Sequence, residues 1–136
     1  MEKVIAVNLD DIEYRKVQNI SGRMKLTTER IKCTEREDFD FTLEDIYRGK
    51  YKEHKKQVHE DESAESIEST ESGLRNKSLI LICGLSEKRL DKVLFELRRN
   101  EVLTDFKAIL TQTNKNWTLN RLFSELSRER AAMESR

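Results

Sequence analysis

Hydrophobic and polar positions in residues 1–49 follow two periods, which together predict the order β-α-β-α. A short apolar run at 3–9 has the length of a strand, and 29–35 alternates as a half-buried strand does. The stretches 10–26 and 36–50 carry apolar residues at helical spacing instead. The apolar positions expected to face the core are Ile12, Val17, Ile20, Met24, Ile31, Cys33, Leu43, Ile46 and Tyr47.

Residues 75–136 repeat this order with more apolar elements. The nearly continuous apolar run at 77–85 is typical of a buried strand, and 104–112 predicts a second strand. Helices are predicted over 86–101 and 118–134, each with one apolar stripe. The stripes consist of Leu90, Val93, Leu94, Leu97, Leu119, Leu122, Phe123 and Leu126.

Polar residues and glycine mark the expected helix ends. Asp10 or Asp11 can cap the first helix, and Ser86 can cap the first helix of the second half. Gly49 follows the closing helix of the first half, where glycine commonly terminates a helix.

The two halves match in sequence as well as in element order, which favours a duplication. An aromatic-Thr-Leu string around Thr42 recurs around Thr118, at an offset of 118 − 42 = 76 residues. Leu9 and Leu85 align at the same offset, whereas the middle helices are expected to slip by about one residue. We therefore predict an α/β fold in which two β-α-β-α halves form one four-stranded sheet, parallel or mixed, with packed helices. A pseudo-twofold relation would make the central strand pair antiparallel.

The length of 136 residues is typical of one domain, so residues 1–136 are predicted to form a single domain. Its parts are an N-terminal half (1–49), a flexible charged linker (50–74) and a C-terminal half (75–136). The linker is rich in Lys, Ser and Glu and has too few apolar residues to offset its ordering entropy. Its two histidines and neighbouring acids are read as a solvated charge run rather than a metal site.

The charge balance excludes a bulk electrostatic case for nucleic acid, because 26 basic and 26 acidic residues give a net charge of zero. The charge is uneven, however. Residues 74–136 carry 13 basic and 8 acidic groups, whereas residues 1–47 carry 8 and 11. The two halves can attract each other, or the basic half can recruit an anionic partner.

The two cysteines, Cys33 and Cys83, fit no metal-ligand or redox spacing, and each lies in an apolar run. A reduced, cytoplasmic protein is the expectation. The first residues do not resemble a signal peptide, and no apolar run reaches the ~20 residues of a membrane span. No membrane partner is expected.

A candidate ligand site lies where the strands of the second half end. Ligands favour the carboxyl ends of parallel strands, where helix N-termini offer free N–H groups. Glycine there allows close backbone approach, hydroxyl and amide groups form hydrogen bonds, and a lysine adds a cation. The candidate ligand-binding residues are Gly84, Ser86, Lys107, Thr111, Thr113 and Asn114.

Capping and packing explain the same residues without a ligand. Thr113, Asn114 or Asn116 can cap the last helix, and Trp117 can pack on Leu122 or a neighbour as a structural residue. No glycine-rich phosphate-binding motif is present in the sequence.

The strand ends of the first half are acidic. Clustered carboxylates can hold Mg²⁺ or Ca²⁺, but they also suit helix N-termini through the helix dipole, and the second interpretation is preferred. We therefore predict no metal site and no cofactor. The residues concerned are Asn8, Asp10, Asp11, Glu35, Glu37, Asp38 and Asp40.

Catalytic residues are not recognisable. Both histidines fall in the predicted linker, away from Ser86 and the two cysteines, so no nucleophile-base pair has support. No catalytic residues are predicted.

The second half nevertheless resembles a known family. The signature G-L-S…L…K-A-x-L-T-x-T-N-x-x-W…E-L-x-x-E is similar to this part of the chain. The residues that carry the similarity are Gly84-Leu85-Ser86, Leu90, Leu94, the run 107–117 from Lys107 to Trp117, and Glu125-Leu126 with Glu129. This signature marks an uncharacterised bacterial family catalogued as a domain of unknown function. The resemblance covers roughly residues 78–130 and implies no activity, cofactor or substrate.

Two functional classes remain. The first is a non-catalytic protein-binding or regulatory module that presents the 107–117 surface, or the basic second half, to a protein partner. The alternative is a domain for a small anionic ligand or nucleotide, held at the strand ends of the second half.

Overall fold

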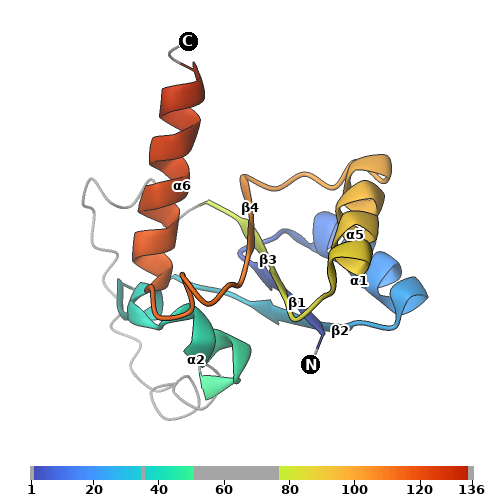
Figure 1. Ribbon diagram of the computed structural model, residues 1–136, viewed down its shortest axis with the longest axis horizontal. Coiled ribbons are helices and arrows are strands. Elements are labelled where there is room, and N and C mark those ends of the chain that lie inside the picture. The colour runs from blue at the N-terminus through green and yellow to red at the C-terminus, as the bar shows by residue number, and fades with distance from the viewer. Residues whose placement is uncertain (1, 35, 51–76, 135–136) are drawn as a thin grey trace. The chain divides into compact units, whose positions relative to one another are not determined.

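A computed structural model describes residues 2–34, 36–50 and 77–134 of the chain (Figure 1). The chain divides into two compact units. Unit 1 comprises Met1–Lys32 and Lys77–Leu110, and unit 2 comprises Cys33–Asn76 and Thr111–Arg136. Each unit therefore draws one segment from each half of the sequence. The predicted linker lies outside the described residues except for Lys50.

Unit 1 contains a four-stranded mixed sheet in the order β2-β1-β3-β4. Its strands are β1 (Lys3–Val7), β2 (Thr27–Ile31), β3 (Leu79–Cys83) and β4 (Phe106–Ile109). β1 and β2 are parallel, β3 and β4 are parallel, and the central β1–β3 pair is antiparallel. The predicted α/β class with one four-stranded sheet is confirmed, and of the two arrangements considered the sheet is mixed.

The central β1–β3 pair has a symmetric register. Lys3 pairs with Cys83 and Val7 pairs with Leu79, so the middle pair is Ile5 and Leu81. These two residues differ by 81 − 5 = 76 positions, the offset at which the halves of the sequence align. The midpoint of the pairing thus joins equivalent residues, as a local twofold relation requires.

One face of this sheet is covered by α1 (Asp11–Met24) and α5 (Glu87–Arg99), which lie side by side (Figure 1). Strand residues of alternating position point toward these helices, as the pleat of a β-strand dictates. The buried core that results consists of Val4, Ala6, Leu9, Val17, Ile20, Met24, Leu26, Ile80, Ile82, Val93, Leu97 and Val102.

The ends of α1 and α5 keep the 76-residue offset. In each half a residue with positive φ follows the first strand, a side chain caps the helix, and a second positive-φ residue follows the helix. The pairs are Asn8 (φ 57°) and Gly84 (φ 77°), Asp10 and Ser86, and Lys25 (φ 60°) and Glu101 (φ 53°). The expected one-residue slip of the helices is therefore wrong. The halves lose register only later, because β2 begins at Thr27 and β4 at Phe106, which differ by 106 − 27 = 79.

Polar side chains fasten each end of the helix pair. Glu13 is buried, accepts the Leu103 N–H at 2.8 Å, and pairs with Lys16 at 3.2 Å. Its counterpart at offset 76, Arg89, donates to the Met24 carbonyl at 2.7 Å and pairs with Glu2 at 2.7 Å. Each helix therefore uses its first turns to hold the chain that ends the other helix.

The structure corrects two details of unit 1. Ile12 was expected in the core but is 70% exposed, since Glu13 takes the inward position for its contact with Leu103. The second strand was expected over 29–35, and β2 instead ends at Ile31.

Unit 2 contains the 3-10 helix η1 (Arg36–Asp40), α2 (Leu43–Tyr47) and α6 (Leu119–Glu134). The single helix expected over 36–50 is thus divided, because Thr42 adopts an extended conformation and begins a new helix. Rings of η1 and α6 meet where Phe39 lies 5.9 Å from Phe123 between centroids. The described helices lack the length and apolar character needed to cross a membrane.

Unit 2 also contains a symmetric contact. Thr42 and Thr118 form an isolated antiparallel bridge, and they too differ by 76 positions. The Leu43 N–H donates to the Trp117 carbonyl, and the Leu119 N–H donates to the Phe41 carbonyl, both at 2.9 Å. Leu43 corresponds to Leu119 at the offset of 76, and Phe41 corresponds to Trp117, so the two bonds are equivalent. The starts of α2 and α6 therefore pair reciprocally.

Thr118 caps α6, because its Oγ1 accepts the Arg121 N–H at 3.1 Å. Thr42 caps α2 in the same way, through the Asp45 N–H at 3.1 Å. The expectation that Thr113, Asn114 or Asn116 caps the last helix is therefore wrong. The capping threonine is the one shared by both halves.

Candidate functional site

The strand ends of the second half form one rim in unit 1. β3 and β4 are parallel, so their carboxyl ends lie at the same edge of the sheet, and the Leu110 N–H extends the ladder to the Ile82 carbonyl at 2.9 Å. Gly84 and Ser86 follow β3 at this rim and are exposed. The Ser86 hydroxyl accepts the Arg89 N–H at 3.4 Å and caps α5, as predicted.

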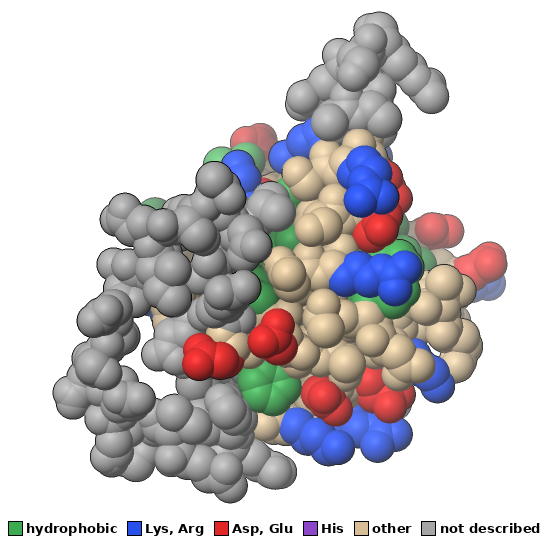
Figure 2. Space-filling model, turned by 90° about the vertical axis from the view of Figure 1, so that its left-hand side faces the viewer, with side chains coloured by type: hydrophobic (Ala, Val, Ile, Leu, Met, Phe, Trp, Pro, Cys, Tyr) green, Lys and Arg blue, Asp and Glu red, His purple; other side chains and the backbone are tan. Residues whose placement is uncertain are grey.

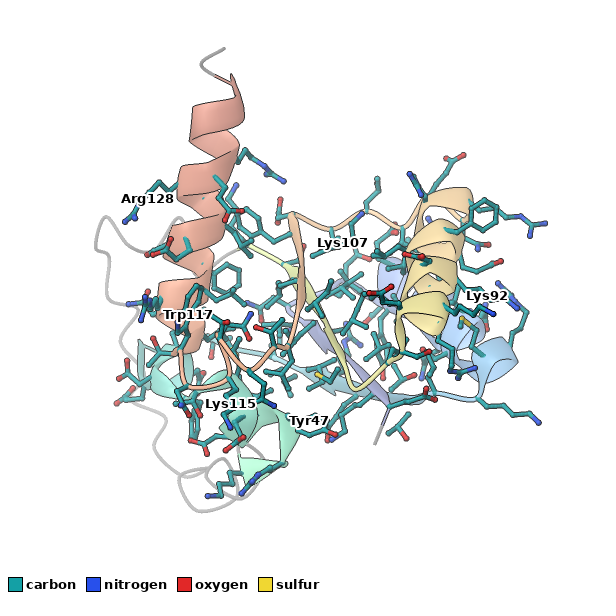
Figure 3. The ribbon with its side chains drawn as sticks, in the orientation of Figure 1. Tyr47, Lys92, Lys107, Lys115, Trp117 and Arg128 are labelled. Carbon is teal, nitrogen blue, oxygen red and sulfur yellow. The ribbon has the colours of Figure 1, made fainter. Side chains whose placement is uncertain are left out.

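Lys107 does not lie at this rim. It is the second residue of β4, pairs with Ile80 and is exposed (Figure 3). Its side chain shares a sheet face with Ile80, which packs among the residues under α1 and α5. Lys107 is therefore near the amino end of β4, whereas Gly84 and Ser86 lie at the rim formed by the carboxyl ends of β3 and β4.

The remaining candidate residues belong to unit 2, where two of them form a closed turn. The Thr111 N–H donates to the Asn114 side-chain oxygen at 2.8 Å, and the Asn114 N–H donates to the Thr111 hydroxyl at 3.2 Å. The Lys115 N–H adds a bond to the Thr111 carbonyl at 3.1 Å. This reciprocal pattern is the one that a capping box uses, and Thr113 is exposed within it.

Trp117 is half-buried at the start of α6 (Figure 3). The Arg121 guanidinium lies 4.3 Å from the centre of its ring, a cation–π geometry. The Trp117 N–H donates to the Asn114 carbonyl at 2.9 Å. Trp117 lies just before the capping Thr118, and Arg121 lies in the first turn of α6.

The rim of the first half is closed by an arginine that sequence reasoning missed. Arg30 donates to the Leu9 carbonyl at 2.8 Å, pairs with Asp11 at 2.7 Å and lies 5.0 Å from the Tyr14 ring centre. The two strand ladders place Ile109 at the equivalent position of the second half, since 30 + 79 = 109. Ile109 is 39% exposed, so the rim of the second half lacks this clamp.

The acidic groups of the first half serve local structure. The Asp10 carboxylate accepts the Glu13 N–H at 2.8 Å, and the buried Asp38 accepts the Thr34 N–H at 2.9 Å. Across residues 2–34, 36–50 and 77–134, no group of three or more His, Cys, Asp or Glu is arranged to hold a metal ion.

Cys33 and Cys83 are both buried and form no disulfide with each other. Burial raises the pKa of Cys83 from 9.0 to about 12, with the nearby Lys3 lowering it and Glu29 raising it. The Cys83 thiol is therefore protonated at neutral pH and behaves as a small apolar side chain rather than a nucleophile.

The outer face of α5 holds a feature that sequence reasoning missed. Phe95 is 53% exposed, although the helix buries Val93 and Leu97 beside it. Lys92 and Arg98 lie three residues away on either side and are also exposed. The available signal was an aromatic residue off the apolar stripe of an amphipathic helix.

Charges on the face drawn in Figure 2 are mixed. On the face drawn in Figure 2, Lys and Arg side chains stand beside Asp and Glu side chains rather than gathering by sign. In unit 2 such neighbours include Arg128 with Glu125 at 3.6 Å and Arg48 with Glu44 at 3.7 Å. Pairs of this exposed kind add little to stability.

The fold and its rims define an α/β protein built on a small mixed sheet. Residues 78–133 match the model of a family described as "Domain of unknown function (DUF3783)". The match covers β3, α5, β4 and most of α6, which confirms that the second half resembles a family of unknown function. No curated protein and no solved structure matches the chain.

Proposed function

We propose that the protein is a non-catalytic binding or regulatory module that acts by contacting another protein. One observation carries the proposal: three of the four candidate residues with side-chain oxygens, Ser86, Thr111 and Asn114, accept N–H groups of their own turns. Ser86 accepts the Arg89 N–H, while Thr111 and Asn114 accept one another's N–H groups. An oxygen that already accepts an N–H has fewer lone pairs left for a hydrogen bond to a small ligand. The open surface of the protein is therefore the better candidate for binding.

Exposed apolar side chains support the same proposal. Ile12 and Leu103 are each 70% exposed, and the bond from the Leu103 N–H to Glu13 brings their chain segments together. Phe95 and Ile109 are exposed as well. Exposed apolar groups that cluster with polar neighbours are typical of protein-binding surfaces.

The test is recovery of a defined partner by the full-length tagged protein at physiological salt, followed by reconstitution from purified components. We expect a complex of fixed stoichiometry by calorimetry and light scattering. A protein that forms no reconstituted complex with any recovered candidate, yet is stabilised by a small molecule, contradicts the proposal.

The alternative function, binding of a small anionic ligand or nucleotide, is supported by one contrast. Exposed Gly84 has a positive φ, and the rim beside it has Ile109 where the other rim has Arg30. A thermal-shift screen of anionic metabolites tests it. Under this alternative Ser86→Ala on the rim of unit 1 abolishes the shift, whereas an equal shift in wild type and variant excludes the site.

We further propose that the halves arose by duplication and that the protein is bacterial and cytoplasmic. The shared offset of 76 residues at the Ile5–Leu81 and Thr42–Thr118 pairs supports the duplication. The two cysteines, Cys33 and Cys83, are not joined in a disulfide, which supports a reducing compartment. Measured fractionation and thiol titration of the native protein test the location.

A further inference from the structure

We infer that the outer face of α5 docks an acidic protein segment that carries a large apolar side chain. This inference rests on the proposed function and specifies its surface. The docking face is defined by Lys88, Lys92, Phe95, Arg98 and Arg99.

These side chains share one side of the helix. Residues three or four apart are neighbours on a helix surface, and the positions 88, 92, 95 and 99 follow that spacing, with Arg98 beside them. All five are exposed. Figure 3 shows Lys92 directed away from the strands of unit 1. Phe95 therefore sits in the middle of a row of cations rather than against the core.

The cations of this face are largely available. Within the described part of the chain, Lys88, Lys92 and Arg98 form no ion pair, while Arg99 reaches Glu96 at 3.7 Å. Asp91 is the acid on the same side, one turn before Phe95. The face is thus net positive around its aromatic centre, although the whole chain is neutral.

The equivalent face of α1 shows that the fold does not require these residues. At offset 76 the counterparts of Phe95 and Arg98 are Asn19 and Gly22. The counterpart of Lys92 is Lys16, which is fastened to Glu13 and to the Glu101 carbonyl at 3.1 Å. The helix with the same position in the sheet is thus built without an exposed aromatic ring or unpaired cations at these positions.

The chemistry of the face specifies the occupant. An exposed aromatic ring gains most from contact with another apolar side chain, and aromatic and arginine residues are enriched among those that dominate interface energetics. The surrounding ammonium and guanidinium groups attract carboxylates and speed encounter with an acidic surface. A protein segment rich in Glu or Asp with an apolar anchor satisfies both requirements.

The test titrates the full-length ¹⁵N-labelled protein with two synthetic peptides. The first peptide is rich in glutamate and carries leucines three or four residues apart, as on one face of a helix. The second peptide has serine in place of each leucine. We expect the leucine peptide to shift the amide signals of α5 around Phe95 and to bind roughly tenfold more weakly to Phe95→Ala or Lys92→Glu. Its affinity should fall as salt is raised, and the serine peptide should bind more weakly.

Matched controls lie on α1. Asn19→Ala changes the exposed counterpart of Phe95, and Arg15→Glu makes the same charge change as Lys92→Glu, so both should leave peptide binding unchanged. Folding of each variant is checked by its amide spectrum. Equal binding by wild type and α5 variants, or no binding at all, overturns the docking face.

Tighter binding of an oligouridylate than of the leucine peptide, lost in Lys92→Glu, also overturns the inference and assigns the face to nucleic acid. The proposed function is tested separately. If a reconstituted protein complex is unaffected by Phe95→Ala and Lys92→Glu, the protein-binding role stands and this surface does not.

Discussion

The helices α1 and α5 occupy equivalent positions in unit 1 but present different outer surfaces. Each helix begins with a side-chain cap and is followed by a positive-φ residue. The caps of the two helices lie 76 positions apart in the sequence, and so do the positive-φ residues. Inward, Val17 and Val93 are counterparts and are both buried. Outward, Phe95 stands exposed where α1 has Asn19.

This contrast separates the residues that the fold requires from the residues that it does not require. Features that both helices share, such as the caps and the buried valines, are the ones that the sheet needs from any helix in that position. Features that only one helix has need another explanation. The same logic distinguishes the rim closed by Arg30 from the rim that carries Ile109.

The largest expected effect is on the buried anchors of the two helices. Ile20→Ala and Leu97→Ala each remove a side chain that is 2% exposed, and each should lower the free energy of unfolding by about 2–5 kcal/mol. Urea denaturation measures both losses. A large loss in one variant and almost none in the other would show that the helices do not share a structural role.

A smaller loss is expected at the polar contacts that hold the helix ends. Glu13→Ala leaves the Leu103 N–H without its acceptor, at a cost of about 1–3 kcal/mol. Arg89→Ala should cost less, because its side chain is 38% exposed and solvent screens the ion pair. Unfolding measurements with Lys16→Ala and the double variant Glu13→Ala/Lys16→Ala separate the ion pair from the backbone bond. An Arg89 loss larger than the Glu13 loss contradicts this ranking.

The helix caps should be interchangeable. Asp10→Ala and Ser86→Ala each remove a cap and should cost about 1 kcal/mol. Asp10→Ser and Ser86→Asp exchange the caps between halves and should retain most of the stability, because both residue types accept the N–H bond. Thermal melting of the four variants tests this, and a cap exchange as harmful as alanine refutes it.

Cys83→Val replaces Cys83 by the residue at its counterpart position, Val7, since 7 + 76 = 83. At neutral pH we expect a change below about 1.5 kcal/mol, as for volume-conserving substitutions. Above pH 9.0 the unfolded thiol ionises while the folded thiol, with its pKa raised to about 12, stays protonated. Stability should therefore fall through this window more in wild type than in Cys83→Val. Parallel pH titrations of unfolding that coincide would contradict the raised pKa.

The smallest effect on stability is expected for Phe95→Asn, which gives α5 the outer residue of α1. Exposed substitutions away from structural contacts usually change stability by less than about 0.5 kcal/mol. Denaturation should therefore show no clear change, although peptide binding should weaken roughly tenfold, as for Phe95→Ala. A destabilisation similar to that of Leu97→Ala would mean that Phe95 packs structurally.

The pattern of the sequence predicts what local physics determines. The apolar runs identified β1 and β3, and Ser86 was identified as a cap because the residues that it serves follow it directly. The exposure of Ile12 could not be predicted, because it depends on the Glu13 carboxylate accepting the N–H of Leu103, 90 positions later in the chain.

The same limit applies to the rims and to the start of α6. Arg30 closes its rim through Leu9 and Asp11, which only the parallel pairing of β1 and β2 brings near. Local capping preferences favour Thr113, Asn114 or Asn116 over Thr118, although the match of Thr118 with Thr42 is visible in the sequence. The sequence match between the halves thus locates the cap of α6 better than local capping preferences do.

The symmetric β1–β3 register has a consequence for assembly. A contact whose midpoint joins equivalent residues, as Ile5 and Leu81 do, is isologous, the kind that closes a two-subunit oligomer. The covalent connection converts that association into an intramolecular one and sets the effective concentration of β3 around β1. Separated fragments that carry the two halves should therefore recover the sheet of unit 1 only in a concentration-dependent manner.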